Sequence, residues 1–191
     1  MPTPMGHALG GLAAAFITDS TAARSRLTPA LLGAAAVVAT LPDLDLLVDS
    51  HRTYAHSVGA VCVIGLASWL ILRARSTRAA RAAIIVMAAY GSHLLLDWTG
   101  TDTSNPPGLM IAWPLSSEFY ISGWNVFGQV SRRYWRPQEF IAGNMVAFAR
   151  EMAVIVPMLF IAWTVWSTRT LTLDSETKSE NGKTNKANAS R

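Results

Sequence analysis

The amino-acid sequence predicts an all-α fold, a polytopic bundle of membrane helices with about five membrane segments. Hydrophobic residues make up 51% of the 191 residues, and charged residues make up only 15%. The charges are unevenly placed, because long apolar stretches carry none whereas residues 168–191 are polar almost throughout. A soluble domain spreads its charges over its surface, so this distribution is typical of a chain whose solvent is mostly lipid.

The composition also argues against two other classes of site. The net charge of +4 is modest, and the basic residues do not alternate with aromatic ones, so we expect no nucleic-acid partner. Cys62 is the only cysteine, which excludes a disulfide within the chain and a cysteine-based zinc site.

The first apolar stretch, residues 5–18, is rich in Gly and Ala. It is short for a membrane span, which needs about 20 residues. Gly6 and Gly10 form a GxxxG pattern that suits close contact between helices. No Lys or Arg precedes the stretch, so we expect an uncleaved first segment rather than a signal peptide.

The second and third stretches are residues 29–48 and 56–72, joined by a short link at 49–55. Pro42 interrupts the second stretch, and a proline both lacks a backbone N–H and disfavours helix at the residue before it. We therefore expect a broken helix there, a device that membrane proteins use to line polar cavities.

The fourth and fifth stretches are residues 82–98 and 144–167, separated by a long segment rich in proline and aromatic residues. Aromatic side chains favour the membrane–water interface, so we expect this segment, 99–143, to lie at the surface or to re-enter the membrane. The sequence thus predicts a membrane domain at residues 1–167 and a disordered polar tail at residues 168–191.

The basic residues predict the orientation of these stretches. If each stretch crosses the membrane, the loops after the first and third stretches lie on the same side as the tail. That side carries Arg24, Arg26, Arg73, Arg75, Arg78, Arg81, Arg169 and the tail lysines. The positive-inside rule makes it cytoplasmic. Arg132, Arg133 and Arg136 oppose this assignment, but they lie in a long loop, where the rule is weaker.

All the histidines and three aspartates fall at the opposite, outward-facing ends of the stretches. They are His7, His51, His56, His93, Asp43, Asp45 and Asp97. A carboxylate at mid-bilayer costs about 2.5–3.5 kcal/mol, and the apolar runs offer no obvious cation as a partner. A bound divalent metal would offset this cost, so the sequence predicts one metal site near the outer surface.

The spacing of these residues agrees with a shared ligand. His93 and Asp97 are four residues apart, which places them on one helix face. Asp43 and Asp45 would diverge on a helix, but in an extended turn after the proline they share a face. Imidazole and carboxylate ligands favour zinc, with manganese or iron as alternatives.

Several segments, in this order, resemble the YdjM-type family of bacterial inner-membrane proteins, usually described as membrane-bound metal-dependent hydrolases. They are His7 with the small residues after it, LPDLD at 41–45, HRTYAHS at 51–57, HLLLD at 93–97 and AWPL at 112–115. The family usually has Thr where this chain has Ala55, a position not expected to supply a ligand. The resemblance implies a multi-pass protein of the bacterial inner (plasma) membrane.

The YdjM-type family is similar, more distantly, to zinc-dependent phospholipases C and single-strand nucleases, which hold a zinc cluster on helical His and Asp residues. The resemblance implies that the metal ligands are His7, Asp43 or Asp45, His56, His93 and Asp97, with His51 as a further candidate. The similar enzymes hydrolyse phosphoesters. From this analogy and from the outward position of the site, we expect a phosphoester substrate at the outer leaflet, with a lipid headgroup as the favoured form.

These expectations give roles to the remaining polar residues. Asp45 or Asp43 would bridge ions or act as a general base, Arg52 would hold a phosphate oxygen, and Ser57 would orient a ligand. Two alternatives stay open: a structural or regulatory protein that binds metal without turnover, and a metal or proton transporter. The nearly apolar inner halves of the helices argue against a transporter.

Overall fold

The computed structural model describes residues 2–22, 27–48, 51–131 and 135–189, and in these residues it is helical with no named strand. The α-helices are α1 (Pro4–Ser20), α2 (Pro29–Val38), α3 (Val58–Arg73), α4 (Ala79–Trp98) and α5 (Pro137–Ala189), and the 3-10 segments are η1 (Leu41–Val48) and η2 (Tyr54–His56). The predicted all-α fold is confirmed. Arg24, Arg26, Arg132 and Arg133 of the orientation argument lie outside the described residues.

Local sequence signals account for the helix starts and for the break between α2 and η1. Thr3, Thr28 and Ser57 precede α1, α2 and α3, and each hydroxyl accepts a hydrogen bond from the backbone N–H three residues on. Such side chains satisfy N–H groups that have no partner within the helix. Helix α2 ends at Val38 and η1 begins at Leu41, so the chain breaks beside Pro42, as the sequence predicts.

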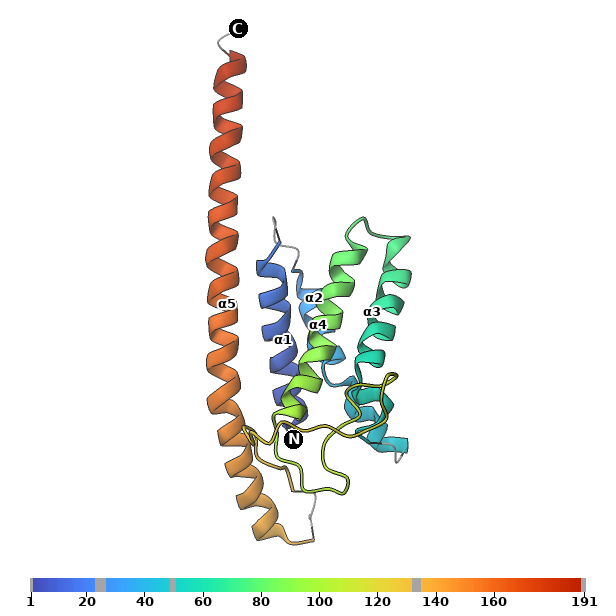
Figure 1. Cartoon of the computed structure of the whole chain (residues 1–191). Helices are drawn as coiled ribbons and strands as arrows, with labels where there is room; N and C mark the ends of the chain where they lie inside the picture. The colour runs from blue at the N-terminus through green and yellow to red at the C-terminus, as the bar shows by residue number, and fades with distance from the viewer. Residues whose placement is uncertain (1, 23–26, 49–50, 132–134, 190–191) are drawn as a thin grey trace.

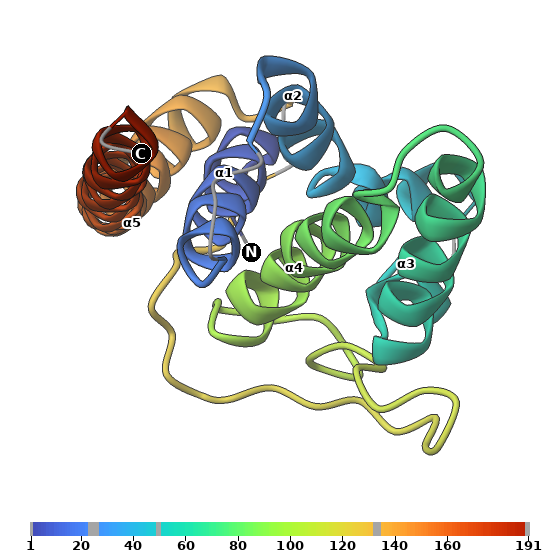
Figure 2. The same cartoon turned by 90° about the horizontal axis from the view of Figure 1, so that it is seen from above.

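Helix α1 lies at the centre of the bundle, between α5 and α4 (Figure 2). It packs against α2, α4 and α5, and α4 also packs against α2 and α3. Three glycines of α1 allow the neighbouring helices to approach closely, because they have no side chain. Gly6 faces α5, Gly10 faces Leu96 of α4, and Gly11 faces Ala39 at the end of α2. The small residues of the first stretch therefore serve three different helix contacts.

Three helical segments are long and apolar enough to cross a membrane, namely Pro29–Leu47, Ala79–Trp98 and Phe140–Leu173. Helices α1 and α3 have 17 and 16 residues. At 1.5 Å per residue they are about 24–26 Å long, shorter than a hydrocarbon core of about 30 Å. The predicted count of about five membrane segments is therefore not confirmed.

The two ends of the bundle differ in what they carry (Figure 1). The C-terminal end of α1, the N-terminal end of α2 and residues 74–78 between α3 and α4 lie at one end, and η1, η2 and residues 99–131 lie at the other. Helix α5 continues past the bundle to Ala189 (Figure 1), so residues 168–189 are helical where the composition predicts disorder. The predicted disorder of this tail in solution stays a prediction.

Candidate metal centre

Side chains from four elements meet where η1 and η2 approach α1 and α4. Helix α1 supplies His7, η1 supplies Asp43, η2 supplies His56, and α4 supplies His93 and Asp97. The three histidines and Asp97 are 0% exposed, whereas the Asp43 side chain is 22% exposed. These five residues, predicted from the sequence as metal ligands, thus come together from distant parts of the chain.

Four ligand atoms from Asp43, His56, His93 and Asp97 face one another within 4.8 Å. The two Nε2 atoms of His56 and His93 are 3.1 Å apart. Asp97 Oδ2 lies 3.3 Å from His93 Nε2 and 3.5 Å from His56 Nε2. Asp43 Oδ1 lies 3.7 Å and 3.9 Å from the same two nitrogens. We call these four atoms the acceptor cluster.

The hydrogen bond at Nδ1 of His56 and of His93 determines whether Nε2 of the same ring is a donor or an acceptor. His93 Nδ1 lies 2.8 Å from the Ala39 carbonyl oxygen, which can only accept, so Nδ1 carries the proton. His56 Nδ1 lies 2.9 Å from Asp45 Oδ2 and likewise donates. In a neutral imidazole the other nitrogen is then an acceptor. Both Nε2 atoms therefore direct lone pairs at two carboxylates, an arrangement that a cation would stabilise.

His7 lies on the other side of Asp97. Its ring stacks on that of His93 with 3.6 Å between the centroids, and His7 Nε2 is 3.3 Å from Asp97 Oδ1. Although this is ion-pair distance, both His7 nitrogens and both Asp97 oxygens are buried without a hydrogen bond to any described residue. Most buried polar groups have a partner, so the Asp97 oxygens and one His7 nitrogen fit the ligands of a cation.

Asp45 lies behind His56, away from the acceptor cluster. Its Oδ1 accepts from His51 Nδ1 at 2.8 Å, and its Oδ2 accepts from His56 Nδ1 and, at 3.0 Å, from the Arg52 backbone N–H. Asp45, His51 and His56 form a second group that has metal-ligand geometry, but their facing atoms are already joined by these hydrogen bonds. The geometry gives Asp45 the place of a residue that orients a ligand.

The Ser57 hydroxyl contacts the backbone. It donates to the Tyr54 carbonyl at 2.6 Å and accepts from the Ala60 N–H at 3.1 Å. Ser57 is therefore the N-cap of α3. These contacts fix the chain immediately after His56, and the orienting of a ligand by Ser57 stays a prediction.

The Arg52 guanidinium is tied to the segment that follows α4. Its Nη1 donates to Asp102 Oδ2 and to the carbonyls of Pro106 and Gly108, the latter two at 3.1 Å and 3.0 Å. Among the described residues, no hydrogen bond involves its Nε or Nη2. Burial raises the pKa of Asp102, but hydrogen bonds from Ser104 and Gly108 and the Arg52 charge outweigh it, so that pKa lies below its usual range. The pair is therefore ionic at neutral pH.

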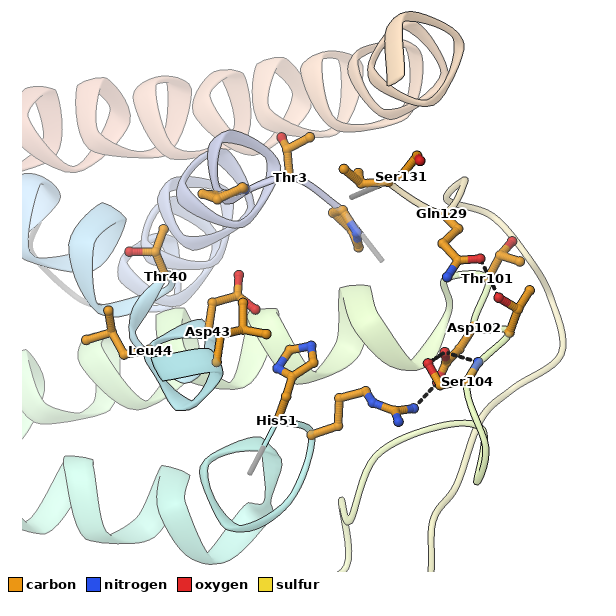
Figure 3. A pocket seen from close by; sticks show the side chains of 16 residues that line it. Thr3, Thr40, Asp43, Leu44, His51, Thr101, Asp102, Ser104, Gln129 and Ser131 are labelled. Atoms are coloured by element: carbon orange, nitrogen blue, oxygen red, sulfur yellow. Dashed lines mark hydrogen bonds and ion pairs between the residues drawn. The ribbon is translucent and has the colours of Figure 1, made fainter. Parts of the chain in front are cut away.

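A pocket of about 920 Å³ opens beside Asp43 and Arg52. Figure 3 shows Asp43 and His51 on one side of it and Asp102 and Gln129 on the other. Its further lining consists mainly of small polar side chains and also includes Leu44 and Leu46. The pocket gives a polar ligand access to the one member of the acceptor cluster that is partly exposed.

A model of the YdjM inner membrane protein family matches residues 1–172. The chain belongs to this family. None of the curated proteins and none of the solved structures compared with the chain matches it. The YdjM match includes every candidate ligand and confirms the resemblance seen in the sequence motifs. It makes the chain an inner membrane protein.

Two features of the centre of this YdjM family member were not predicted from its sequence. Asp102, the partner of Arg52, is the only acidic residue between Asp97 and Glu118, and that isolation was an available signal. The Ala39 carbonyl that fixes His93 left no signal, because any residue carries a backbone carbonyl.

Proposed function

We propose that this chain is a membrane-embedded, metal-dependent hydrolase of phosphoesters, with a lipid headgroup at the outer leaflet as the favoured substrate. The acceptor cluster carries the proposal. Two imidazole nitrogens and two carboxylate oxygens converge in a buried place, where uncompensated negative charge is costly. A divalent cation is the partner that such a donor set fits.

The donor chemistry favours zinc, with manganese or iron as alternatives. Asp43, His56, His93 and Asp97 would hold the ion, and His7 with Asp97 Oδ1 offers donors for a second one. A bound divalent cation supplies Lewis acidity, which lowers the pKa of water and stabilises negative charge on a phosphoryl group.

The remaining residues of the site have roles that follow from their positions. Asp43 is the cluster carboxylate that lines the pocket, so we assign it the general base that takes a proton from the attacking water. Arg52 lines the same pocket, and its Nε and Nη2 groups would bind a phosphoryl oxygen. Asp45 would hold the tautomer of His56.

Two observations support a lipid substrate and an outward-facing site. Leu44, Leu46 and Leu47 of η1 are 57%, 38% and 81% exposed. The first two also line the pocket, so acyl chains would pass along them into the bilayer. Arg73, Arg75, Arg78 and Arg81 lie toward the opposite end of the bundle, which the positive-inside rule assigns to the cytoplasm. The C-terminal tail would then be cytoplasmic.

A metal-binding protein without turnover is the second candidate. The specific observation in its favour is that four protein side chains converge on one place, because structural zinc sites are closed by four protein ligands whereas catalytic sites keep one position open. The exposure of Asp43 at the pocket favours the hydrolase.

The test is an assay of purified protein, loaded with Zn²⁺ or Mn²⁺, on a soluble chromogenic phosphodiester and on phospholipid vesicles. We expect wild-type turnover. At saturating metal, which offsets the weaker binding caused by the loss of a ligand carboxylate, Asp43→Asn should lose about 10²–10⁴-fold, the usual contribution of a general base. Asp19→Asn, a buried aspartate at the other end of α1, is the matched control and should keep its activity. Bound metal without turnover on any substrate would contradict catalysis and support the structural role.

A second arm of the assay tests the orientation. An impermeant phosphodiester should be cleaved by intact spheroplasts and not by sealed inverted vesicles until detergent is added. The reverse result would place the site on the cytoplasmic side and would leave the hydrolase proposal standing.

A further inference from the structure

A buried carboxylate outside the acceptor cluster joins α5 to the first turn of α1. Glu151 is 1% exposed. Its Oε2 accepts the Thr3 backbone N–H at 2.9 Å, and its Oε1 accepts the Thr3 hydroxyl at 2.7 Å. The carboxylate therefore lies at the N-terminal end of α1, where the helix dipole stabilises negative charge.

The contact between Glu151 and Thr3 continues directly to His7. The Thr3 hydroxyl oxygen accepts the Gly6 N–H at 3.2 Å, and the Thr3 carbonyl accepts the His7 N–H at 3.1 Å. Gly6 itself stands against the Glu151 carboxylate so closely that a Cβ there would collide with it. Glu151 thus fixes the backbone from which the His7 side chain extends.

The His7 ring depends on this backbone more than the other rings do. His56 and His93 are each held by a hydrogen bond at Nδ1. Neither nitrogen of His7 has such a bond to a described residue, and its recorded neighbours are the His93 ring and Asp97. The position of the imidazole is therefore set mainly by the first turns of α1.

A second contact fixes α1 against α5 at the other end. Asp19 Oδ2 accepts a hydrogen bond from Trp166 Nε1 at 2.9 Å. The step from Thr3 to Asp19 is 16 residues and the step from Glu151 to Trp166 is 15 residues, which are about 24 Å and 22 Å along a helix. Helices α1 and α5 run in the same direction (Figure 1). The Thr3–Glu151 and Asp19–Trp166 contacts are therefore compatible with each other and together fix the alignment of α1 along α5.

We propose that Glu151 is a positioning residue of the metal centre. By holding Thr3, it fixes the first turn of α1 and sets the His7 imidazole against Asp97. This inference rests on metal binding at the proposed centre and is independent of turnover.

A thermodynamic cycle on full-length protein in nanodiscs tests it, with Zn²⁺ as the probe and a chelator competition as the readout. Glu151→Gln keeps the shape of the side chain and removes its charge. We expect Glu151→Gln and His7→Ala each to weaken Zn²⁺ binding by about 10–100-fold, the usual range for groups that support a ligand. The double variant should be no weaker than His7→Ala alone, because both changes act through the same side chain.

Trp166→Phe is the matched control, since it removes the hydrogen bond at the other end of the α1–α5 contact and should leave the affinity unchanged. Wild-type affinity in Glu151→Gln, or effects that multiply in the double variant, would overturn the positioning role alone. A wild-type protein that binds no Zn²⁺ would overturn the proposed metal centre itself.

A spectroscopic readout separates positioning from general destabilisation. With Co²⁺ as the probe, Glu151→Gln should change the ligand-field spectrum in the same direction as His7→Ala, whereas Trp166→Phe should keep the wild-type spectrum. If Glu151→Gln does not fold, Thr3→Val removes the hydroxyl bonds to Glu151 and to the Gly6 N–H but keeps the backbone N–H bond to Glu151, and it should give a smaller change of the same kind. An unaltered Co²⁺ spectrum in the folded variant would contradict the role.

Discussion

At the scale of single residues, two histidines of the centre are fixed through the nitrogen that points away from it. Asp45 holds His56, and the Ala39 carbonyl holds His93. These bonds select the tautomer that leaves Nε2 as an acceptor. Carboxylate–histidine pairs of this kind raise the basicity of the ligand as well as orienting it. The residues that would bind the ion therefore differ from those that orient its ligands.

Asp45→Asn tests this separation. The amide has one acceptor oxygen in place of two, so it would satisfy only one of the two Nδ1–H groups, of His51 and His56, that meet Asp45. We expect metal affinity to fall by about 10–100-fold, measured by chelator competition, while Asp19→Asn stays at wild type. Complete loss of binding, equal to that of His93→Ala, would instead make Asp45 a direct ligand.

Residue spacing predicted part of this chemistry from the sequence. His93 and Asp97 share a helix face at four residues apart, and their ligand atoms are 3.3 Å apart in the structure. The division of labour between Asp43 and Asp45 could not be predicted, because it depends on how the η1 turn directs each carboxylate. Glu151 was visible only as a charge near the start of the last apolar stretch.

At the scale of elements, the glycines of α1 determine how closely the ligands approach. A Cβ on Gly11 would lie 2.5 Å from the Ala39 Cβ and 2.8 Å from the Ala35 carbonyl oxygen. Ala39 is also the residue whose carbonyl holds His93. The contact between α1 and the end of α2 is therefore coupled to the orientation of one ligand.

Gly11→Ala should destabilise the protein by about 1–3 kcal/mol, because overpacking forces the two helices apart. Gly91→Ala in α4 is the control, since a Cβ there meets nothing within 4 Å, and alanine is a better helix former by about 1 kcal/mol. Thermal unfolding in one detergent measures both. Equal melting temperatures for Gly11→Ala and Gly91→Ala would contradict the close packing of α1 on α2.

The positions of the helices could be predicted from the lengths of the apolar stretches and from the capping residues. The path of the segment between α4 and α5 could not be predicted in this way. That segment is held by backbone bonds to distant residues, such as Val58 N–H to the Ile111 carbonyl at 2.9 Å and Met110 N–H to the Arg52 carbonyl at 3.0 Å. It carries no periodic pattern from which such contacts could be predicted.

At the scale of the whole molecule, the candidate metal centre and the arginines between α3 and α4 lie at opposite ends of the bundle. The candidate centre and its pocket lie at one end, and Arg73, Arg75 and Arg78 lie toward the other (Figure 1). Many helix side chains between these ends, such as Val63, Leu66 and Phe160, are apolar and at least half exposed, as expected where lipid replaces water. The proposed hydrolysis at one membrane surface requires the candidate ligands to lie together near one end of the bundle, and among the described residues Asp43, His56, His93 and Asp97 do so.

Metal analysis of the full-length protein decides whether the acceptor cluster holds a divalent cation. Protein purified without chelators and equilibrated with Zn²⁺ should retain at least one equivalent per chain after desalting. His93→Ala and Asp97→Asn should lose it, while Asp19→Asn should keep it. A folded wild-type protein without metal, or equal metal content in His93→Ala, would contradict cation binding by the acceptor cluster.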